Sequence, residues 1–341
     1  MDTTQFDMMP YSGPRAEVAS VTGSVLVGSP IPETVRRFEE QGWKLTYQAR
    51  VPTPYGLGPL VHGFTTPSGR EAIWIPFYGH VAGRGRQNEI YPRDLFWILW
   101  KAGVKVMVCG SVHGSADWRT GEERISPGDL VIPWSFWRQY PLHGDLPGTP
   151  FGGLYPNLAL MGDAYCKVLG RTIAEWVQQH LVPQTIRRIH TPEDVLAFPI
   201  SPVGGGMSWE SDAETNGWRW WSQLVSTVAP KPVVTLFGGT GIDPVLARKL
   251  GMHLAHYHVC TDFAHGVVGT ADEVVAHIDR LYLQDLPDAI VKLEAWFMKT
   301  LVVPTDCTCM QHLRERPRQY LLGMTQATPS GLPEEGYELT G

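Results

Sequence analysis

The hydrophobic positions of this chain form short apolar runs that alternate with segments of helical periodicity. Bounded by glycine and proline, the apolar runs are typical of buried strands and cover residues 18–27, 71–78, 104–109, 129–134, 232–237 and 253–260. Apolar residues recur at helical spacing in residues 33–41, 92–102, 173–181, 211–228, 243–250, 273–283 and 287–301. This alternation predicts an α/β fold with a largely central sheet flanked by helices.

Glycine- and proline-rich stretches predict long loops at residues 141–157 and 198–206. Neither stretch divides the chain cleanly, and the sequence contains no internal repeat. Although the length would also allow two smaller domains, we therefore predict a single domain over residues 18–321. A flexible lead-in at residues 1–17 and a polar tail at residues 322–341 would flank it.

Composition and charge argue against two classes of partner, nucleic acids and membranes. The chain has 341 residues, 43% of them hydrophobic, and a net charge of −6 without a basic stripe, so we expect no nucleic-acid partner. No apolar run reaches the ~18 residues that span a bilayer, so we expect no membrane insertion. The amino terminus lacks the basic and apolar regions of a signal peptide, and the expected location is the cytoplasm.

The cysteines do not predict a disulfide framework, because they are few and odd in number: Cys109, Cys166, Cys260, Cys307 and Cys309. The Cys-x-Cys at residues 307–309 would form a strained disulfide or hold a metal. His312 is close, but no second Cys/His pair at zinc spacing accompanies it. We therefore expect no metal site, and the redox state of the two cysteines stays open.

The segment Gly-Met-Ser-Trp-Glu-Ser-Asp-Ala-Glu at residues 206–214 carries the clearest chemical signal. Trp209 would lie against the face of a flat ring, and Glu210 would bind an N–H on its edge. The same residues also suit an ordinary helix start. A second segment, Thr261-Asp262-Phe263, ends an apolar run, where Asp262 would serve a ligand, a strand-end cap or an ion pair.

Four segments, in order, resemble the purine nucleoside phosphorylases, especially the trimeric branch that includes methylthioadenosine phosphorylase. Residues 206–214 are similar to the family pattern Gly-Pro-x-Phe-Glu-Thr-x-Ala-Glu, and residues 240–248 to Thr-Val-Pro-Glu-Val-x-x-Ala. Thr261-Asp262 stands where the family has Thr-Asn or Thr-Asp, and residues 126–132 are close to its Pro-Gly-Asp strand entry. The resemblance spans roughly residues 18–303 and implies one domain with a mixed, partly barrel-like sheet.

This resemblance implies cleavage of the bond between a pentose and a purine, with phosphate as co-substrate and without a cofactor. The sugar becomes oxocarbenium-like while negative charge builds on the departing base. Trp209 would stack on the purine, and Glu210 would bind its N1–H edge. Asp262 would lie at N7 and the 6-substituent, where it donates only if protonated, a form that burial favours.

The resemblance also implies a phosphate and ribose side. Ser24 stands in the family's small phosphate loop, and Ser111 and His113 stand in a glycine-containing turn after a strand. His80 matches the histidine of the family's Arg-His-Gly, so we expect it to position phosphate. The arginine of that motif has become Gly79.

Two basic residues close to Gly79 offer a replacement. Arg84 or Arg86 would bind phosphate in place of the missing arginine, or both would belong to a solvated loop. Gly238-Gly239 replaces the family's Met-Ser or Met-Thr, so Gly239 offers its backbone but no hydroxyl. A charged hydrogen bond is worth about 1.5–3 kcal/mol, and losing two would weaken phosphate binding greatly. Ala264 replaces a second family aspartate, which disfavours a 6-aminopurine, whereas Glu210 favours a 6-oxopurine.

Three functions follow from these residues. The first is a purine nucleoside phosphorylase that uses His80 and Asp262 as catalytic residues. The second is a nucleosidase that uses water, with Asp262 as general acid. The third is a nucleoside-binding or biosynthetic relative without phosphorolysis. The resemblance further implies a homotrimer or hexamer, in which the tryptophan-rich helix at residues 218–221 would form an interface, although a monomer stays open.

Overall fold

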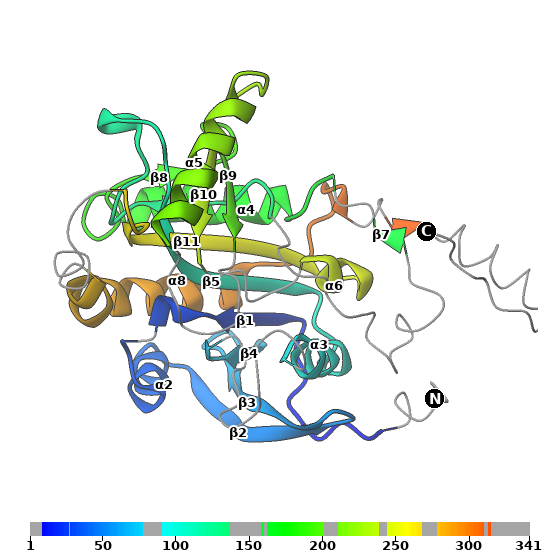
Figure 1. The fold of residues 1–341 in the computed structure, drawn as a ribbon. Helices are drawn as coiled ribbons and strands as arrows, with labels where there is room; N and C mark the ends of the chain where they lie inside the picture. Colours follow the sequence, from blue (N-terminus) through cyan, green and yellow to red (C-terminus); the bar gives the residue numbers. More distant parts are fainter. Residues whose placement is uncertain are drawn as a thin grey trace, which may run out of the picture.

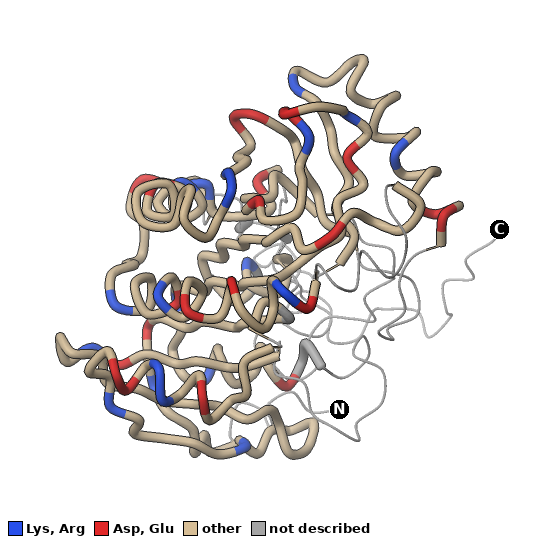
Figure 2. Tube along the Cα trace, turned by 90° about the vertical axis from the view of Figure 1, so that its left-hand side faces the viewer, with Lys and Arg blue, Asp and Glu red and all other residues tan. Residues whose placement is uncertain are grey.

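The computed structural model describes residues 9–26, 28–77, 91–136, 158–159, 162–200, 211–238, 244–267, 278–309 and 313–314. Within these residues, a ten-stranded mixed sheet lies between helices (Figure 1). This arrangement confirms the predicted α/β class with a large central sheet. Acidic and basic residues are interspersed along the helices and loops seen in Figure 2.

The strands of the large sheet are β1 (Val18–Thr22), β2 (Lys44–Thr53), β3 (Gly56–Thr65), β4 (Glu71–Ile75), β5 (Val106–Ser115), β6 (Leu130–Val131), β8 (Ile189–His190), β9 (Leu196–Ile200), β10 (Val233–Phe237) and β11 (His253–Phe263). Their order is β2-β3-β4-β1-β5-β11-β6-β8, with β10 pairing to β5 and β9. A separate two-stranded sheet joins β7 (Leu158–Ala159) to β12 (Leu313–Arg314).

The helices that flank the sheet are α2 (Ile31–Glu40), α3 (Tyr91–Ala102), α4 (Lys167–His180), α5 (Asp212–Ser226), α6 (Pro244–Lys249) and α8 (Leu286–Thr300). One face of the sheet packs with α2, α4 and α8, and the other with α3 and α6. Among the described residues, no helix combines the length and the apolarity that a membrane crossing requires.

Two long parallel strands, β5 and β11, form the centre of the sheet. Every residue of β5 is buried, as expected for a strand covered on both faces. The first half of β5 pairs with β1 in parallel, whereas its end pairs with β10 in antiparallel orientation. The neighbour of β5 therefore changes from β1 to β10 along its length. This change brings the ends of β1 and β10 to the same stretch of β5.

The structure extends some predicted elements and corrects others. The strands predicted at residues 104–109 and 253–260 continue to Ser115 and Phe263. The loop predicted from residue 198 is wrong at its start, because Pro199 lies in β9, which pairs only with β10 among the described strands and so tolerates a residue without an N–H. The predicted loop at 141–157 and tail at 322–341 lie outside the described residues. The helix predicted at 273–283 is described only from residue 278, and its end lies in a π-helix at Leu281–Asp285.

Candidate active site

The ends of β1 and β10 meet on the same stretch of β5. The backbone N–H of Gly23, just after β1, donates to the Gly110 carbonyl at 2.7 Å. Phe237, the last residue of β10, pairs with Gly114, and Gly238 follows it. Loops from two strands thus converge where the neighbours of β5 change. Crevices at such switch points are the usual ligand sites of α/β sheets.

Gly238 occupies a position that excludes a side chain. Its φ of +123° lies in the region that favours glycine, and a Cβ there would lie 3.0 Å from the Val112 carbonyl oxygen. Residue 238 lies directly against β5 in a conformation that favours glycine, which explains why glycine stands here in place of the family's methionine. Gly239, which follows, lies outside the described residues.

Ser111 and His113 are alternate residues of β5, so they share one face of the strand. Both are buried, and burial lowers the pKa of His113 to about 3. Neither ring nitrogen of His113 has a hydrogen-bond partner among the described residues. At neutral pH His113 therefore offers an N–H donor but no positive charge. Its assignment to phosphate or ribose, like that of Ser111, stays a prediction.

A row of histidines continues from His113 across β11, which the sequence analysis did not single out. The His113 and His258 ring centroids are 5.6 Å apart, and those of His258 and His256 are 4.3 Å apart. Burial lowers the pKa of His256 to about 3 and that of His258 well below its ordinary value. The row is therefore neutral, and its buried rings lie on one face of β5 and β11.

Asp262 lies at the carboxyl end of β11, directly after a shift in register between Cys260 and Asp262. Such bulges redirect side chains and are frequent beside active sites. The Thr261 hydroxyl donates to Asp262 Oδ1 at 2.7 Å, and Oδ2 lies 3.0 Å from the position of a Cβ built on Gly114. The half-buried carboxyl group therefore lies against the backbone of β5.

The beginning of α5 lies against the turn that follows Asp262. Asp212 Oδ1 and His265 Nδ1 are 2.6 Å apart, and a Cβ on Gly266 would lie 2.8 Å from the same Asp212 oxygen. Ser211 and Glu214 form a capping box, in which the Glu214 carboxylate accepts from the Ser211 backbone N–H at 2.8 Å. The described end of the 206–214 motif thus lies beside the turn that follows Asp262.

Several predicted site residues lie outside the described residues, and their roles stay predictions. These residues are Trp209 and Glu210, which directly precede Ser211, and His80, Arg84 and Arg86, which lie between β4 and α3. Ser24 begins a 3-10 helix at Ser24–Leu26, directly after Gly23, and its side chain is also outside the description.

A buried carboxyl group, Glu294 of α8, connects the opposite face of β11 to β1. It accepts a hydrogen bond from the Tyr257 hydroxyl at 2.5 Å and another from the Ser20 hydroxyl. Burial raises the pKa of Glu294 to about 8. A Cβ on Gly110 would lie 2.2 Å from the Tyr257 hydroxyl oxygen. The network therefore packs directly against β5, the strand on which the loops after β1 and β10 converge.

The Pro-Gly-Asp segment has a structural role at the entry to β6. Asp129 accepts from the Arg187 guanidinium at 2.8 Å and lies 2.9 Å from His190 Nε2. Burial opposes ionisation, but these hydrogen bonds hold the pKa of Asp129 below its ordinary value. The motif therefore fixes a loop, and its carboxylate is engaged by protein groups.

A hollow of about 1110 Å³ lies between α4 and α8, beside Gln41 and Trp43, which follow α2. Trp43, Trp176 and Trp296 contribute to its lining, together with charged residues. None of the predicted site residues that the structure describes lines this hollow.

Comparison with known proteins agrees with this arrangement at the level of the fold. A methylthioadenosine phosphorylase sourced from an antarctic soil metagenomic library superposes with a TM-score of 0.56 at 18% identity, covering 92% of this chain and 99% of the other. A double mutant of adenosine/methylthioadenosine phosphorylase from Schistosoma mansoni, in complex with adenine, gives 0.59 at 16% identity over 90% and 100% of the two chains.

This chain has the nucleoside phosphorylase fold. The methylthioadenosine phosphorylase from Schistosoma mansoni in complex with tubercidin is also similar, with a TM-score of 0.55 at 15% identity over 91% and 98% of the chains. No protein-family model matches the sequence, and no curated protein matches it. The nucleoside phosphorylase fold of this chain thus comes with a strongly diverged sequence.

Proposed function

We propose that the protein is a purine nucleoside phosphorylase-like enzyme that cleaves the N-glycosidic bond of a purine nucleoside. Phosphate would be the nucleophile, and the products would be free base and a pentose 1-phosphate. The contact between Asp212 and His265 carries this proposal, because it joins the 206–214 motif to the turn after Asp262. Structures of the same fold in complex with adenine or tubercidin support a purine-like ligand.

On the base side, the proposed chemistry depends on groups that act as negative charge develops. Asp262 would donate to N7 in its protonated form or accept from an exocyclic amino group. Trp209 would stack on the ring and Glu210 would bind its N1–H edge, both directly before the Ser211 cap of α5.

On the nucleophile side, the backbone N–H groups of Gly23 and Gly238 already donate to the Gly110 and Ile200 carbonyls, so side chains would have to bind the phosphate. His113 is neutral, so the positive charge must come from elsewhere. Arg84 and Arg86 follow β4, which is parallel to β1 and ends at the same edge of the sheet. We therefore assign the charge on phosphate to one of these arginines, with His80, Ser24 and Ser111 as further ligands.

The second candidate function is a nucleosidase, which one observation favours. The close approach of Gly238 to the Val112 carbonyl leaves no room for the methionine that the family places under the ribose. The hydroxyl of the family's next residue is also missing, because residue 239 is glycine. If neither Arg84 nor Arg86 binds phosphate, water would be the nucleophile and Asp262 the general acid.

Release of free base distinguishes these functions. Purified protein is incubated with inosine, guanosine, adenosine and methylthioadenosine, with and without phosphate, and the free base is followed by chromatography. We expect release that requires phosphate. Release of equal rate without phosphate would identify a nucleosidase. Absence of release from all four nucleosides would overturn both proposals and favour a binding or biosynthetic role.

We also propose a homo-oligomer, a trimer or hexamer, with one side of α5 at the interface. Trp220 and Leu224 are one helical turn apart on α5, and Val228 follows the end of the helix; the three are 66%, 51% and 85% exposed. Light scattering of Trp220→Glu should show a smaller assembly than the wild type, whereas Leu57→Ser, an exposed apolar residue on β3, should not change it. A monomeric wild type would contradict this proposal.

A further inference from the structure

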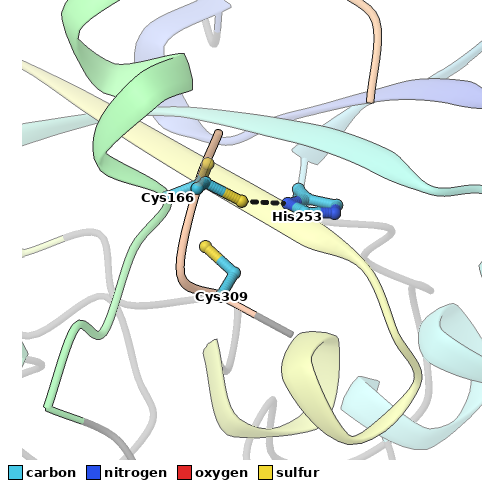
Figure 3. A group of neighbouring side chains, drawn as sticks. Cys166, His253 and Cys309 are labelled. Carbon is cyan, nitrogen blue, oxygen red and sulfur yellow. Dashed lines mark hydrogen bonds between the residues drawn. The ribbon is translucent and has the colours of Figure 1, made fainter. Parts of the chain in front are cut away.

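Four side chains of metal-binding type lie together at the amino end of β11. The thiol sulfurs of Cys166, Cys307 and Cys309 and a ring nitrogen of His253 all lie within 4.8 Å of one another. Figure 3 shows Cys166, His253 and Cys309 pointing toward one another from different segments. Cys166, His253 and Cys309 are buried and Cys307 is half-buried, so the group belongs to the interior of the protein.

The fold holds two of these residues in fixed positions. Cys166 directly precedes α4, and its backbone N–H donates to the Leu254 carbonyl at 2.7 Å. His253 is the first residue of β11, and its backbone N–H donates to the Lys105 carbonyl at 2.7 Å. Main-chain hydrogen bonds therefore place Cys166 beside the start of β11 whether or not an ion is bound.

The other two residues come from the segment after α8, which has little regular structure. Cys307 Sγ lies 3.2 Å from His253 Nδ1, and the Thr308 hydroxyl donates to Asp163 Oδ2 at 3.1 Å. Thr308 thus faces the residues before α4, while the cysteines on either side of it reach Cys166 and His253. All five cysteines of the chain are free thiols, including this pair.

We propose that Cys166, His253, Cys307 and Cys309 bind one Zn²⁺ ion in a closed tetrahedral site. Three thiolates and one imidazole form a regular ligand set for structural zinc, whereas magnesium and calcium prefer oxygen ligands. With Zn–S bonds of about 2.3 Å, tetrahedral ligand atoms lie about 4 Å apart. The observed spread of up to 4.8 Å requires only a small contraction around the ion.

The surroundings suit the charge of such a site. Three thiolates and one Zn²⁺ carry a net charge of −1. The buried guanidinium of Arg248 donates to the Asp163 carbonyl, and its positive charge acts on Cys309. Arg248 therefore offsets the excess negative charge of the loaded site. The expectation of no metal rested on the absence of a second Cys/His pair at short spacing, but the fold supplies that pair from distant residues.

The proposed ion has a structural role. His253 and Asp262 lie at opposite ends of β11, about 30 Å apart at the usual rise of an extended strand. The four protein ligands complete the tetrahedron, so no position stays open for water or substrate. Zinc would fasten the segment after α8 to α4 and to the start of β11, which gives this irregular segment a fixed position.

Metal analysis tests the proposal on the full-length protein, purified without a metal-affinity tag under reducing conditions. We expect one zinc per chain by mass spectrometry of the elements. Replacement by Co²⁺ should give thiolate-to-cobalt charge-transfer bands and the intense visible bands of a tetrahedral site. Cys309→Ser should lose most of its zinc on dialysis against EDTA, whereas Cys109→Ser, a buried cysteine outside the cluster, should retain it.

A second measurement applies if Cys309→Ser does not fold. A mercurial reagent added to the wild type should release zinc in proportion to the thiols modified, with a fall in melting temperature. The proposal is overturned if reduced wild-type protein incubated with ZnCl₂ retains no zinc after desalting. A Cys307–Cys309 disulfide in the reduced preparation, or equal zinc loss by Cys109→Ser and Cys309→Ser, would overturn it as well. None of these results depends on nucleoside cleavage.

Discussion

The two ends of β11 differ in what surrounds them. At the amino end, His253 lies among three cysteines that protein atoms enclose. At the carboxyl end, Asp262 follows a bulge and lies against Gly114, close to a turn that contacts α5. One rigid strand thus carries a closed cluster suited to holding the fold together and a glycine-lined end suited to a ligand. Changes at the two ends should therefore have separable effects.

Asp262→Asn should cause the largest loss, and it should affect chemistry alone. An amide cannot transfer a proton to N7, so we expect kcat/KM for base release to fall roughly 100- to 1000-fold, or about 3–4 kcal/mol. Melting temperature and zinc content should stay at wild-type values. The matched control is Asp279→Asn, an exposed aspartate before α8, which should retain full activity. A wild-type rate for Asp262→Asn would remove this carboxyl group from the mechanism.

Glu294 contacts Tyr257 in the middle of β11, between the two ends compared above. Its replacement, Glu294→Gln, should change how the free energy of unfolding depends on pH. The folded pKa of about 8 exceeds the ordinary 4.5, so the folded state holds a proton that the unfolded state releases. This contribution is fully present below pH 4.5 and is lost as the pH rises through 8. Between pH 5 and pH 7.5 the loss amounts to about 3 kcal/mol.

Urea unfolding of the two proteins at several pH values measures this difference directly. The free energy of unfolding of the wild type, minus that of Glu294→Gln, should fall steadily from pH 5 to pH 7.5, because groups common to both proteins cancel. The amide retains an acceptor for the Tyr257 hydroxyl and a donor for Ser20, so the variant should fold. A difference independent of pH would show that Glu294 is ionised in the folded protein.

Gly238→Ala should destabilise the carboxyl end by on the order of 1–3 kcal/mol, through backbone strain and contact with the Val112 carbonyl. Gly69→Ala is the matched control, since Gly69 also has a positive φ but no atom within 4 Å of a Cβ. Thermal unfolding should show a greater loss for Gly238→Ala, accompanied by slower base release. Equal losses would mean that φ alone, and not the close approach, requires glycine.

Asp212→Ala should have the smallest effect. Asp212 and His265 are 65% and 47% exposed, so their contact should stabilise the fold by less than about 1 kcal/mol. Because this contact orients the start of α5, we expect KM for the nucleoside to rise about 2- to 5-fold, at similar kcat. Asp288→Ala, which breaks another exposed ion pair, should leave KM unchanged. An unchanged KM in Asp212→Ala would separate this contact from ligand binding.

The sequence predicted the centre of the fold well because buried strands such as β5 and β11 are nearly continuous apolar runs. It missed the hairpin of β2 and β3, since most of β2 is exposed and polar and lacks a clear alternation. It also missed Glu294, because a lone carboxylate at helical spacing usually lies on the surface. The network with Ser20 and Tyr257 depends on the tertiary fold.

The two ends of β11 were also unequal in what the sequence could predict. At the carboxyl end, the residues proposed to act on the base come from contiguous motifs at 206–214 and 261–263, and the structure places Asp212 of the first beside His265, just after the second. At the amino end, Cys166 and His253 are far from the Cys-x-Cys in the sequence, and neither carries a motif. Only the packing of α4, β11 and the segment after α8 shows that they form one cluster.

The central claim is that the carboxyl end of β11 cleaves a purine nucleoside with phosphate. The most direct measurement identifies the sugar product formed from inosine, guanosine, adenosine and methylthioadenosine by purified protein in phosphate buffer. The account predicts a pentose 1-phosphate in equal amount to the free base. Free pentose in its place would show that water is the nucleophile, and the absence of any sugar product from all four nucleosides would contradict the account.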